Sequence, residues 1–414
     1  NGRVAADGSE ILPLDTKGLM HDLIRIKSKG INSLAIVFMF SFRYPEHELI
    51  AKRIASEVGF TQISVSHELS PLIKLVSRGD TTVVDAYLSP LLRRYIDNLS
   101  SELIGVELQF MQSSGGLVEA KAFCGKDAIL SGPSGGVVGA AKTSSLSGFD
   151  KIIGFDMGGT STDVSRFDGQ YERQYDSEVA GIRIRSPMMN IHTVAAGGGS
   201  ILHFDGARYR VGPESAGAEP GPACYRRGGP LTVTDCNVML GKISPRYFPQ
   251  VFGKSGCEPI DELVVKRKFE DLACEIALVK GSSIDAKIVA EGFLKVAVQN
   301  MANAIKKISV QKGYDLSDYT LTCFGAAGGQ HACLVADALA IDTILIHPYA
   351  GVLSAYGIGQ AEVRDLKQET IEKTLSTKSF DSISLKLKSL VSKGILELKK
   401  QGIEENKINV EKSL

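Results

Sequence analysis

Hydrophobic positions in the first third of the chain follow two spacings in turn, one typical of helices and one typical of strands. The stretches with helical spacing are 16–29, 45–58 and 81–103. The apolar runs that predict buried strands are 33–40, 62–66 and 107–111. Gly30 and Gly59 can terminate the first two helices, and Pro90 is expected to bend the third. Strands that alternate with helices predict an α/β fold.

A second unit is predicted to begin near Asp150 with an apolar strand, 151–155, that runs into a glycine turn and a second strand, 161–167. Asp168 and Gly169 form a hairpin-turn signal, so the two strands are expected to be antiparallel. Further helices are expected over 254–280, 284–311, 330–339 and 353–362, and further strands over 320–324 and 343–346. The segment 181–225 is rich in Gly and Pro, and the tail 365–414 is charged and helical in pattern.

Composition excludes several classes of protein. The formal net charge is zero, which argues against a polyanion-binding protein. The seven cysteines are an odd number without a C-x-x-C pair, so a disulfide framework or a structural zinc site is not expected. The sequence has neither an apolar run of about 18 residues nor a signal-peptide pattern. A cytoplasmic protein is therefore expected, and the opening residue, Asn1, suggests an excerpt of a longer protein.

The strongest local pattern for chemistry is the stretch 155–164. A strand ends in the carboxylate Asp156, and two glycines then leave backbone N–H groups open to anionic oxygens. The turn and its flanks supply these groups: Gly158, Gly159, the hydroxyls of Thr160, Ser161 and Thr162, and the carboxylate of Asp163. Because Mg²⁺ favours one or two carboxylates plus phosphate oxygens, the turn can hold a phosphate tail and its metal. The alternative is a glycine hairpin with solvated side chains.

Neither a Walker A loop nor a dinucleotide fingerprint fits this turn, because no Gly-Lys-Ser/Thr and no helix follow the glycines. A second glycine turn, 324–331, follows a strand and opens a helix, a setting in which backbone approaches a ligand closely. Strand-hairpin and strand-glycine-helix turns in this order resemble the ATPase superfamily of actin and hexokinase. The small-residue segments 131–141 and 351–359 then look like its crossing helices, although ordinary tight packing is the plainer interpretation.

A specific resemblance covers nearly the whole chain. The sequence resembles the hydantoinase A/5-oxoprolinase family, which implies a two-lobed actin/hexokinase-like α/β fold. The blocks that carry it are 110–116, 131–133, 154–164, 190–200, 211–215, 220–222, 234–235 and 324–332. Two further blocks, 240–253 and 351–357, resemble the 5-oxoprolinase branch. The implied regions are the remainder of a first lobe with its crossing helix (1–149), a second lobe with both turns (150–364) and the start of a C-terminal region (365–414).

The resemblance implies ATP-dependent opening of the lactam of 5-oxo-L-proline to L-glutamate, with release of ADP and phosphate. It implies Mg²⁺ and often K⁺ as cofactors, a cyclic-amide substrate, a hydantoinase B-like region or subunit as partner, and a homo-oligomer. Neither a nucleic acid nor a membrane is expected as a partner. A related reaction, that of an N-methylhydantoinase or an acetone-carboxylase subunit, stays open, and so does a non-catalytic fragment of such a complex.

The family also implies roles for residues. Asp156 would hold Mg²⁺ or attacking groups near the γ-phosphate, with Asp163 and Thr162 supporting the loop. Phosphate contacts are expected from Gly158, Gly159, Thr160 and Ser161, and adenosine contacts from Gly325, Gly328 and Gly329. The run Gly197, Gly198 and Gly199 is expected on the phosphate side of the cleft or against substrate. Acid/base or metal work is assigned to His192, Glu214 and Asp235, with a buried ring as the alternative for His192 and a turn carboxylate for Glu214.

Two departures from the family pattern change the expectation for this chain. The family's first Asp-x-Gly-Gly-Thr turn does not occur before Asp150, and no hydantoinase B-like region is present. The adenosine turn carries Ala326 where the family more often has glycine. The chain alone is therefore expected to bind ATP poorly and to be inactive. In the first region, His67, Arg78 and Asp80 are expected at a solvated surface.

Overall fold

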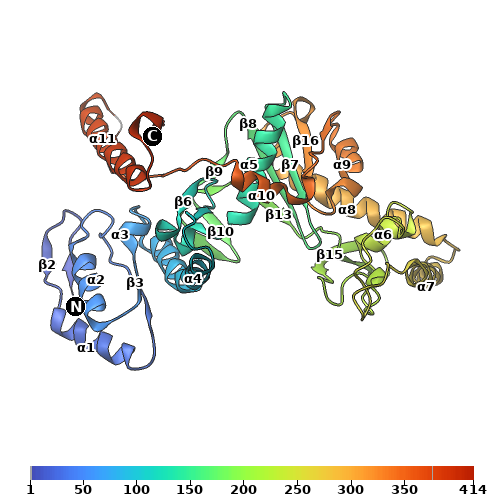
Figure 1. Cartoon of the computed structure of the whole chain (residues 1–414), viewed down its shortest axis with the longest axis horizontal. Helices are drawn as coiled ribbons and strands as arrows, with labels where there is room; N and C mark the ends of the chain where they lie inside the picture. Colours follow the sequence, from blue (N-terminus) through green and yellow to red (C-terminus); the bar gives the residue numbers. More distant parts are fainter. Residues whose placement is uncertain (1, 375) are drawn as a thin grey trace. The chain divides into compact units, whose positions relative to one another are not determined.

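The computed structural model describes residues 2–374 and 376–414 (Figure 1). The chain folds into two compact units, one of Asn1–Ser134, Arg173–Met189 and Ala361–Leu414, the other of Gly135–Glu172 and Asn190–Gln360. This division differs from boundaries at 150 and 365. Segment 173–189 joins the first unit because Arg173 Nε donates to the Ser114 carbonyl and Arg185 N donates to Thr81 Oγ1.

The first unit contains small sheets and five helices among its described residues. Its helices are α1 (Thr16–Lys27), α2 (Glu46–Val58), α3 (Ser66–Leu69), α4 (Leu75–Glu102) and α11 (Thr377–Lys400). Its strands are β1 (Arg3–Val4), β2 (Glu10–Leu12), β3 (Ser33–Ile36), β4 (Gln62–Val65), β5 (Gln109–Met111), β6 (Leu117–Glu119), β9 (Arg173–Gln174), β10 (Ser177–Val179), β11 (Ile182–Ile184) and β12 (Met188–Met189).

The parallel pair β3 and β4 lies between α1 and α2 on one face and α4 on the other. Ser64 Oγ of β4 donates to the Asp85 carboxylate of α4. The predicted strand 33–40 ends early, at Ile36. The reason is the buried carboxylate of Glu48, which accepts hydrogen bonds from the Phe38 N–H at 2.8 Å and the Ser41 hydroxyl at 2.7 Å and so turns the chain away from the strand.

The expectation of a solvated Arg78 was wrong. Its side chain is fully buried, and the guanidinium donates to Ser66 Oγ and to the backbone carbonyls of Leu72 and Met39. A buried cation must have its N–H groups satisfied, and these acceptors lie on the loops that leave β3 and β4. Arg78 therefore joins those loops to α4.

The second unit is built around a five-stranded sheet with the strand order β13-β8-β7-β16-β17. Its strands are β7 (Lys151–Met157), β8 (Thr162–Asp168), β13 (Ile191–Val194), β16 (Thr320–Phe324) and β17 (Ile344–Leu345), with a separate hairpin of β14 (Ser200–Phe204) and β15 (Tyr209–Ser215). Its helices are α5 (Ser131–Leu146, which begins in the first unit), α6 (Val233–Met239), α7 (Glu262–Lys280), α8 (Ala286–Ile308), α9 (Ala332–Leu339) and α10 (Leu353–Gly359).

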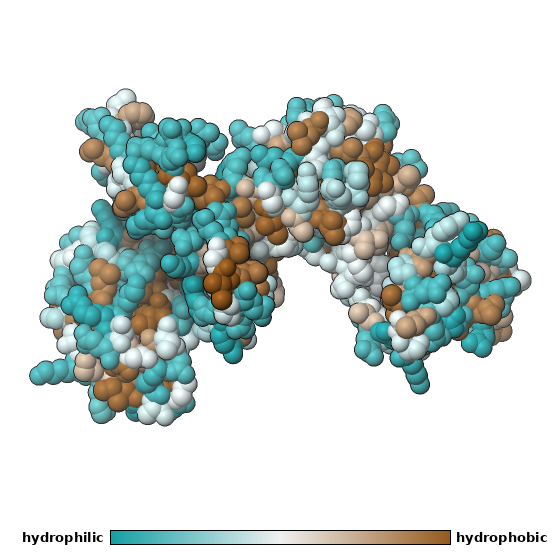
Figure 2. All heavy atoms as spheres, viewed as in Figure 1, coloured by the Kyte–Doolittle hydropathy of each residue, from teal (hydrophilic) through white to brown (hydrophobic). Residues whose placement is uncertain are grey.

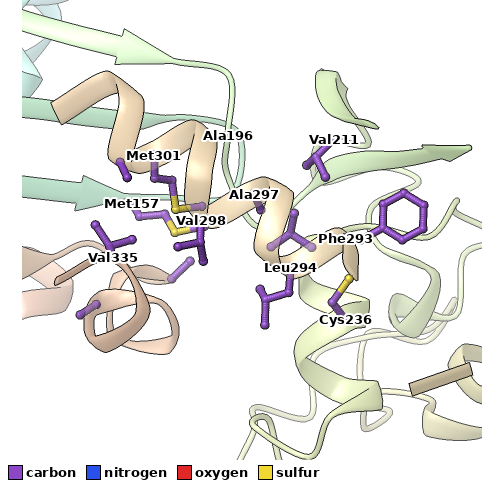
Figure 3. Packing of buried hydrophobic residues seen from close by; sticks show 14 of the residues in the cluster. Met157, Ala196, Val211, Cys236, Phe293, Leu294, Ala297, Val298, Met301 and Val335 are labelled. Carbon is purple, nitrogen blue, oxygen red and sulfur yellow. The ribbon is translucent and has the colours of Figure 1, made fainter. Parts of the chain in front are cut away.

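The two faces of β7 show why this sheet is buried on both sides. Ile153, Phe155 and Met157 pack into the main core with α8 and α9, while Ile152 packs with α5 and α10. Figure 3 shows Met157 gathered with Val298 and Met301 of α8. The antiparallel pairing predicted for β7 and β8 is confirmed, and the α/β class is confirmed with it.

Helices α5 and α10 cross where both carry glycine. A Cβ added to Gly357 would collide with the Gly135 carbonyl oxygen and the Gly139 N–H, and would lie 2.7 Å from Gly139 Cα. A Cβ on Gly139 would lie 2.6 Å from the Leu353 carbonyl oxygen. Only residues without a side chain allow this approach, so the small residues of both segments serve a close crossing, as expected from the sequence.

Two other predicted helices have different boundaries in the structure. The helix predicted from 254 begins only at Glu262, because Asp261 accepts a hydrogen bond from the Val264 N–H and caps it. The helix predicted over 353–362 ends at Gly359. Within 2–374 and 376–414, none of the helices combines the length and the apolar character that a membrane crossing requires.

The crossing predicts a sharp difference between two glycines of α10. Gly357→Ala should lower the free energy of unfolding by about 1–3 kcal/mol, because its methyl group meets backbone atoms. Gly359→Ala should stay within about 1 kcal/mol of wild type, since no atom lies within 4 Å of its Cβ position. Urea unfolding of both variants measures this, and equal stabilities would contradict the close crossing.

Candidate functional site

The carboxylates Asp156 and Asp163 face each other across the β7–β8 hairpin, as directly paired residues in its register. Burial, and then the charge of Asp163, raises the pKa of Asp156 from its ordinary value of 3.8 to about 6. Burial also raises the pKa of Asp163, against the opposing effect of a hydrogen bond from Thr193 Oγ1 at 2.6 Å. Two half-buried carboxylates that form no ion pair with residues 2–374 or 376–414 favour a bound cation or a shared proton.

The second glycine turn lies directly against this pair. Strand β16 runs parallel to β7 and pairs Phe324 with Asp156, so both strands end at the same edge of the sheet. Gly325, at φ +82°, has no room for a Cβ, which would collide with Asp156 Oδ1 and lie 2.5 Å from the Met157 carbonyl oxygen. The Ala327 N–H then donates to that carbonyl at 2.9 Å. The turns at 157–161 and 325–329 are therefore neighbours in space.

The glycine run 197–199 packs against the first turn. A Cβ on Gly197 would lie 2.5 Å from the Thr160 carbonyl carbon and 2.7 Å from the Gly159 oxygen. The Gly198 N–H donates to the Gly158 carbonyl at 3.1 Å, and the Gly199 N–H donates to the Gly159 carbonyl. The run thus lies beside the turn predicted to hold phosphates and supports its backbone.

Within the first turn, the open donors differ from those predicted. The Gly158 N–H closes the turn by donating to the Ser161 carbonyl at 3.1 Å, so it is not free for a ligand in this conformation. The Thr162 hydroxyl is fully buried and donates to the Ala196 carbonyl at 2.6 Å. Gly159 and Thr160 are exposed, and no atom lies within 4 Å of the Gly159 Cβ position. The open end of the turn is therefore Gly159 and Thr160, beside a half-buried Ser161.

His192 and Thr193 lie on β13, which pairs with β8. Thr193 lies opposite Asp163 and donates to it, whereas His192 lies opposite Val164. Burial and the charge of Lys307 lower the pKa of His192, so its neutral form is favoured. Sequence reasoning singled out His192 and missed Thr193, and only the strand register could have shown which of the two faces the carboxylate.

The other two predicted acid/base residues are placed differently. Glu214 is exposed near the end of β15 and has neither a hydrogen bond nor an ion pair within the described part of the chain. Asp235 is fully buried in the first turn of α6, where it forms a capping box with Thr232, and it accepts from the N–H groups of Ala223, Cys224 and Thr232 and from the Thr232 hydroxyl. A carboxylate saturated with four donors favours a structural role for Asp235 over an acid/base role.

The predicted adenosine turn continues into a buried polar cluster. Asn237 Nδ2 of α6 donates to Gln330 Oε1 at 2.7 Å and lies 3.1 Å from His331 Nε2. Burial lowers the pKa of His331 to about 4, so the ring is neutral. Gly328 packs on Phe155 and Cys323, whereas Gly329 is exposed with open space at its Cβ position. Of the three predicted adenosine glycines, Gly329 alone is exposed, and Gly325 is half-buried.

A divalent cation fits the carboxylate pair. Across 2–374 and 376–414, His, Cys, Asp and Glu side chains do not gather in groups of three or more that could hold a metal. A metal held entirely by protein side chains is thus not indicated. Mg²⁺ instead takes one or two carboxylates together with phosphate oxygens and water, and Asp156 with Asp163 offers that donor set.

Comparison with known proteins identifies the family of this chain. The profile of the hydantoinase/oxoprolinase family matches residues 78–367, and that of the hydantoinase/oxoprolinase N-terminal region matches 1–59. The chain belongs to the hydantoinase/oxoprolinase family. It is 42% identical to 5-oxoprolinase 1 of Arabidopsis thaliana over 97% of this chain and 32% of that protein, and 48% identical to 5-oxoprolinase of Saccharomyces cerevisiae over 83% and 27%. The chain spans about a third of the length of such relatives.

Solved structures share the fold. The ATP-dependent caprolactamase of Pseudomonas jessenii matches with a TM-score of 0.84 and 30% identity, over 98% of this chain and 59% of that one. An acetone carboxylase in its nucleotide-free state matches with a TM-score of 0.73 and 23% identity, over 99% and 59%, which shows the fold alone. The family resemblance stated from the sequence is therefore confirmed.

The raised pKa of Asp156 predicts a pH-dependent stability. The unfolded carboxyl loses its proton near pH 3.8 while the folded one keeps it to about pH 6, so stability falls as pH rises through this window. Because one pKa unit is worth about 1.4 kcal/mol, the loss reaches up to about 3 kcal/mol above pH 6. Asp156→Asn should remove this pH-dependent loss. Urea unfolding should therefore show that the stability of the variant relative to wild type is higher at pH 8 than at pH 4. A constant difference across pH would contradict the raised pKa.

Proposed function

We propose that this chain is the ATP-binding, carbonyl-phosphorylating part of a 5-oxoprolinase. The observation that carries the proposal is the meeting of the two glycine turns at the Asp156–Asp163 pair. The support from relatives is the 42–48% identity to proteins named 5-oxoprolinase over most of this chain. The wider class, ATP-dependent opening of a cyclic amide, is also supported by the similarity to a caprolactamase.

The reaction needs ATP because a five-membered lactam is a stable amide and a poor electrophile. The lactam oxygen attacks the γ-phosphorus of ATP, ADP leaves, and the oxygen becomes part of a good leaving group. Water then adds to the activated carbon, the carbon–nitrogen bond breaks, and the nitrogen takes a proton. This cleavage leaves an acyl phosphate. A second water attacks its carbonyl carbon, the bond between that carbon and the phosphorylated oxygen breaks, and phosphate is released, which leaves the γ-carboxylate of glutamate.

In this scheme the residues of the site have separate tasks. Mg²⁺, held by Asp156 with Asp163, would neutralise phosphate charge during the transfer. The Gly159 N–H and the Thr160 hydroxyl bind phosphate oxygens at the open end of the turn, where they are exposed. Thr193 orients Asp163 through its hydrogen bond. Gly329 and its neighbours line the adenosine side, and the family resemblance implies K⁺ as a further cofactor.

Acetone carboxylation is a second candidate only at the level of the fold, because that neighbour is 23% identical. A caprolactamase-like activity has firmer support. The chain is 31% identical to caprolactamase subunit alpha of Pseudomonas jessenii, over all of this chain and 60% of that subunit. Both share activation of a carbonyl by ATP. The choice of ring is therefore the question that an assay must decide. A hydantoinase B-like region is proposed as the partner that completes the reaction.

The direct test is ATP hydrolysis by the longest reading frame that contains this chain, with 5-oxo-L-proline, a hydantoin or caprolactam added. We expect 5-oxoproline to stimulate hydrolysis and to yield glutamate. Asp156→Ala should lower the stimulated rate about 100-fold or more, because charge on the transferring phosphoryl group loses its stabilisation. Asp150→Ala is the matched control, since this exposed aspartate precedes the other end of β7. Stronger stimulation by the hydantoin or by caprolactam would change the proposed substrate. An Asp156→Ala variant with an unchanged rate would contradict the proposed site.

Two glycine substitutions separate ligand contact from folding. Gly159→Ala should keep wild-type stability, because open space surrounds its Cβ, yet weaken MgATP binding, because the methyl group enters the proposed phosphate space. Gly197→Ala should lower both stability and binding, because its Cβ meets the backbone of Gly159 and Thr160. Calorimetric titration with MgATP and thermal unfolding measure the two effects. Unchanged MgATP binding by Gly159→Ala would contradict a phosphate site at Gly159.

A further inference from the structure

Helix α4 carries an apolar stripe that the first unit does not cover. Val83, Tyr87 and Leu91 are 57%, 73% and 51% exposed, and they are spaced four residues apart on one face of the helix. The opposite face is buried against the unit through Arg78, Thr82, Asp85 and Ile96. Figure 2 shows hydrophobic side chains at the surface of the first unit among hydrophilic ones. A stripe of this kind on a helix marks an interaction surface.

The stripe is symmetric about Tyr87. Counting outward from it in either direction, the same face is reached after four, seven and eleven residues. The positions four away are both apolar, Val83 and Leu91. The positions seven away have opposite charges, Asp80 and Arg94. The positions eleven away are Val76, which is exposed, and Asn98.

Such a pattern is complementary to itself when reversed. We infer that α4 pairs with α4 of a second copy of this chain, antiparallel about a two-fold axis at Tyr87. The axis would set the two Tyr87 rings against each other and place each Val83 against the other copy's Leu91. It would also place each Asp80 opposite the other copy's Arg94, twice per dimer.

The charged pair is available for this contact. Neither Asp80 nor Arg94 forms an ion pair or a side-chain hydrogen bond with any other residue in the described ranges. Arg94 is exposed, and Asp80 is half-buried at the edge of the stripe. A parallel pairing would set like charges together and a non-self partner would not require the symmetry, so charge complementarity selects a second copy as the occupant. This inference does not depend on the proposed reaction.

Charge reversal tests the pairing, by sedimentation of the chain over a concentration series. The wild type should reach twice its mass of 44.4 kDa. Asp80→Arg and Arg94→Asp should each remain monomeric, because like charges then meet twice across the axis. An equimolar mixture of the two variants should dimerise, since each copy now supplies the charge that the other lacks. The doubly substituted chain should also regain the dimer.

Glu102→Arg is the matched control. It reverses a charge on the same helix, but its mirror position about Tyr87 is Leu72, which precedes the helix, so dimerisation should not change. Circular dichroism and thermal unfolding should show that all variants fold, since neither Asp80 nor Arg94 makes a side-chain hydrogen bond or ion pair with the described residues. A monomeric wild type, dimeric single variants or a mixture that stays monomeric would each overturn the inference, and the first would leave the stripe to a different protein partner.

Discussion

The proposed site depends on one steric constraint, the contact between the end of β7 and the turn after β16. The parallel pairing sets Phe324 beside Asp156, and the chain must then turn at once within reach of the carboxylate. Gly325 makes this turn at φ +82°, where any Cβ would enter the space of Asp156 Oδ1. A larger residue would push the two turns apart and separate the carboxylate from the predicted adenosine side.

Close backbone contacts that only glycine allows also occur around the β7–β8 hairpin. Gly197 and Gly199 let one loop press on the backbone of 159–160, and Thr162 anchors that loop through the Ala196 carbonyl. Beneath them, Met157 packs with Val298 and Met301 of α8, while Cys236 of α6 lies near Phe293 and Leu294, about one turn earlier on that helix (Figure 3). One helix therefore supports both the turn predicted to bind phosphate and α6, which contributes Asn237 to the polar cluster at His331. Rigid support of this kind suits a site that must position a phosphoryl group.

Sequence reasoning reached the class of fold, the β7–β8 hairpin and both turns, because short apolar strands broken by paired glycines leave few alternatives. It could not determine which hydroxyls and N–H groups face outward. The Gly158 N–H closes its own turn on the Ser161 carbonyl, and the Thr162 hydroxyl donates to the Ala196 carbonyl of a loop more than 30 residues away in the chain. The hydrogen bonds of Asp235 were hidden from the sequence for a similar reason. Its three backbone partners include two from the segment before α6, and a capping box is invisible until that segment folds over it.

The carboxylate pair is half-buried and forms no ion pair with the residues that the structure describes, so what binds there affects its charge state. Isotope transfer tests most directly the claim that ATP phosphorylates the lactam carbonyl at this site. 5-Oxo-L-proline labelled with ¹⁸O in its carbonyl would be turned over in ordinary water by the longest reading frame containing this chain, and the released phosphate analysed by mass spectrometry. The account predicts that the label leaves in phosphate, and that Asp156→Asn abolishes this transfer. Label that stays wholly in the glutamate carboxylate, with ATP consumed, would contradict a phosphorylated carbonyl oxygen that leaves with the phosphate.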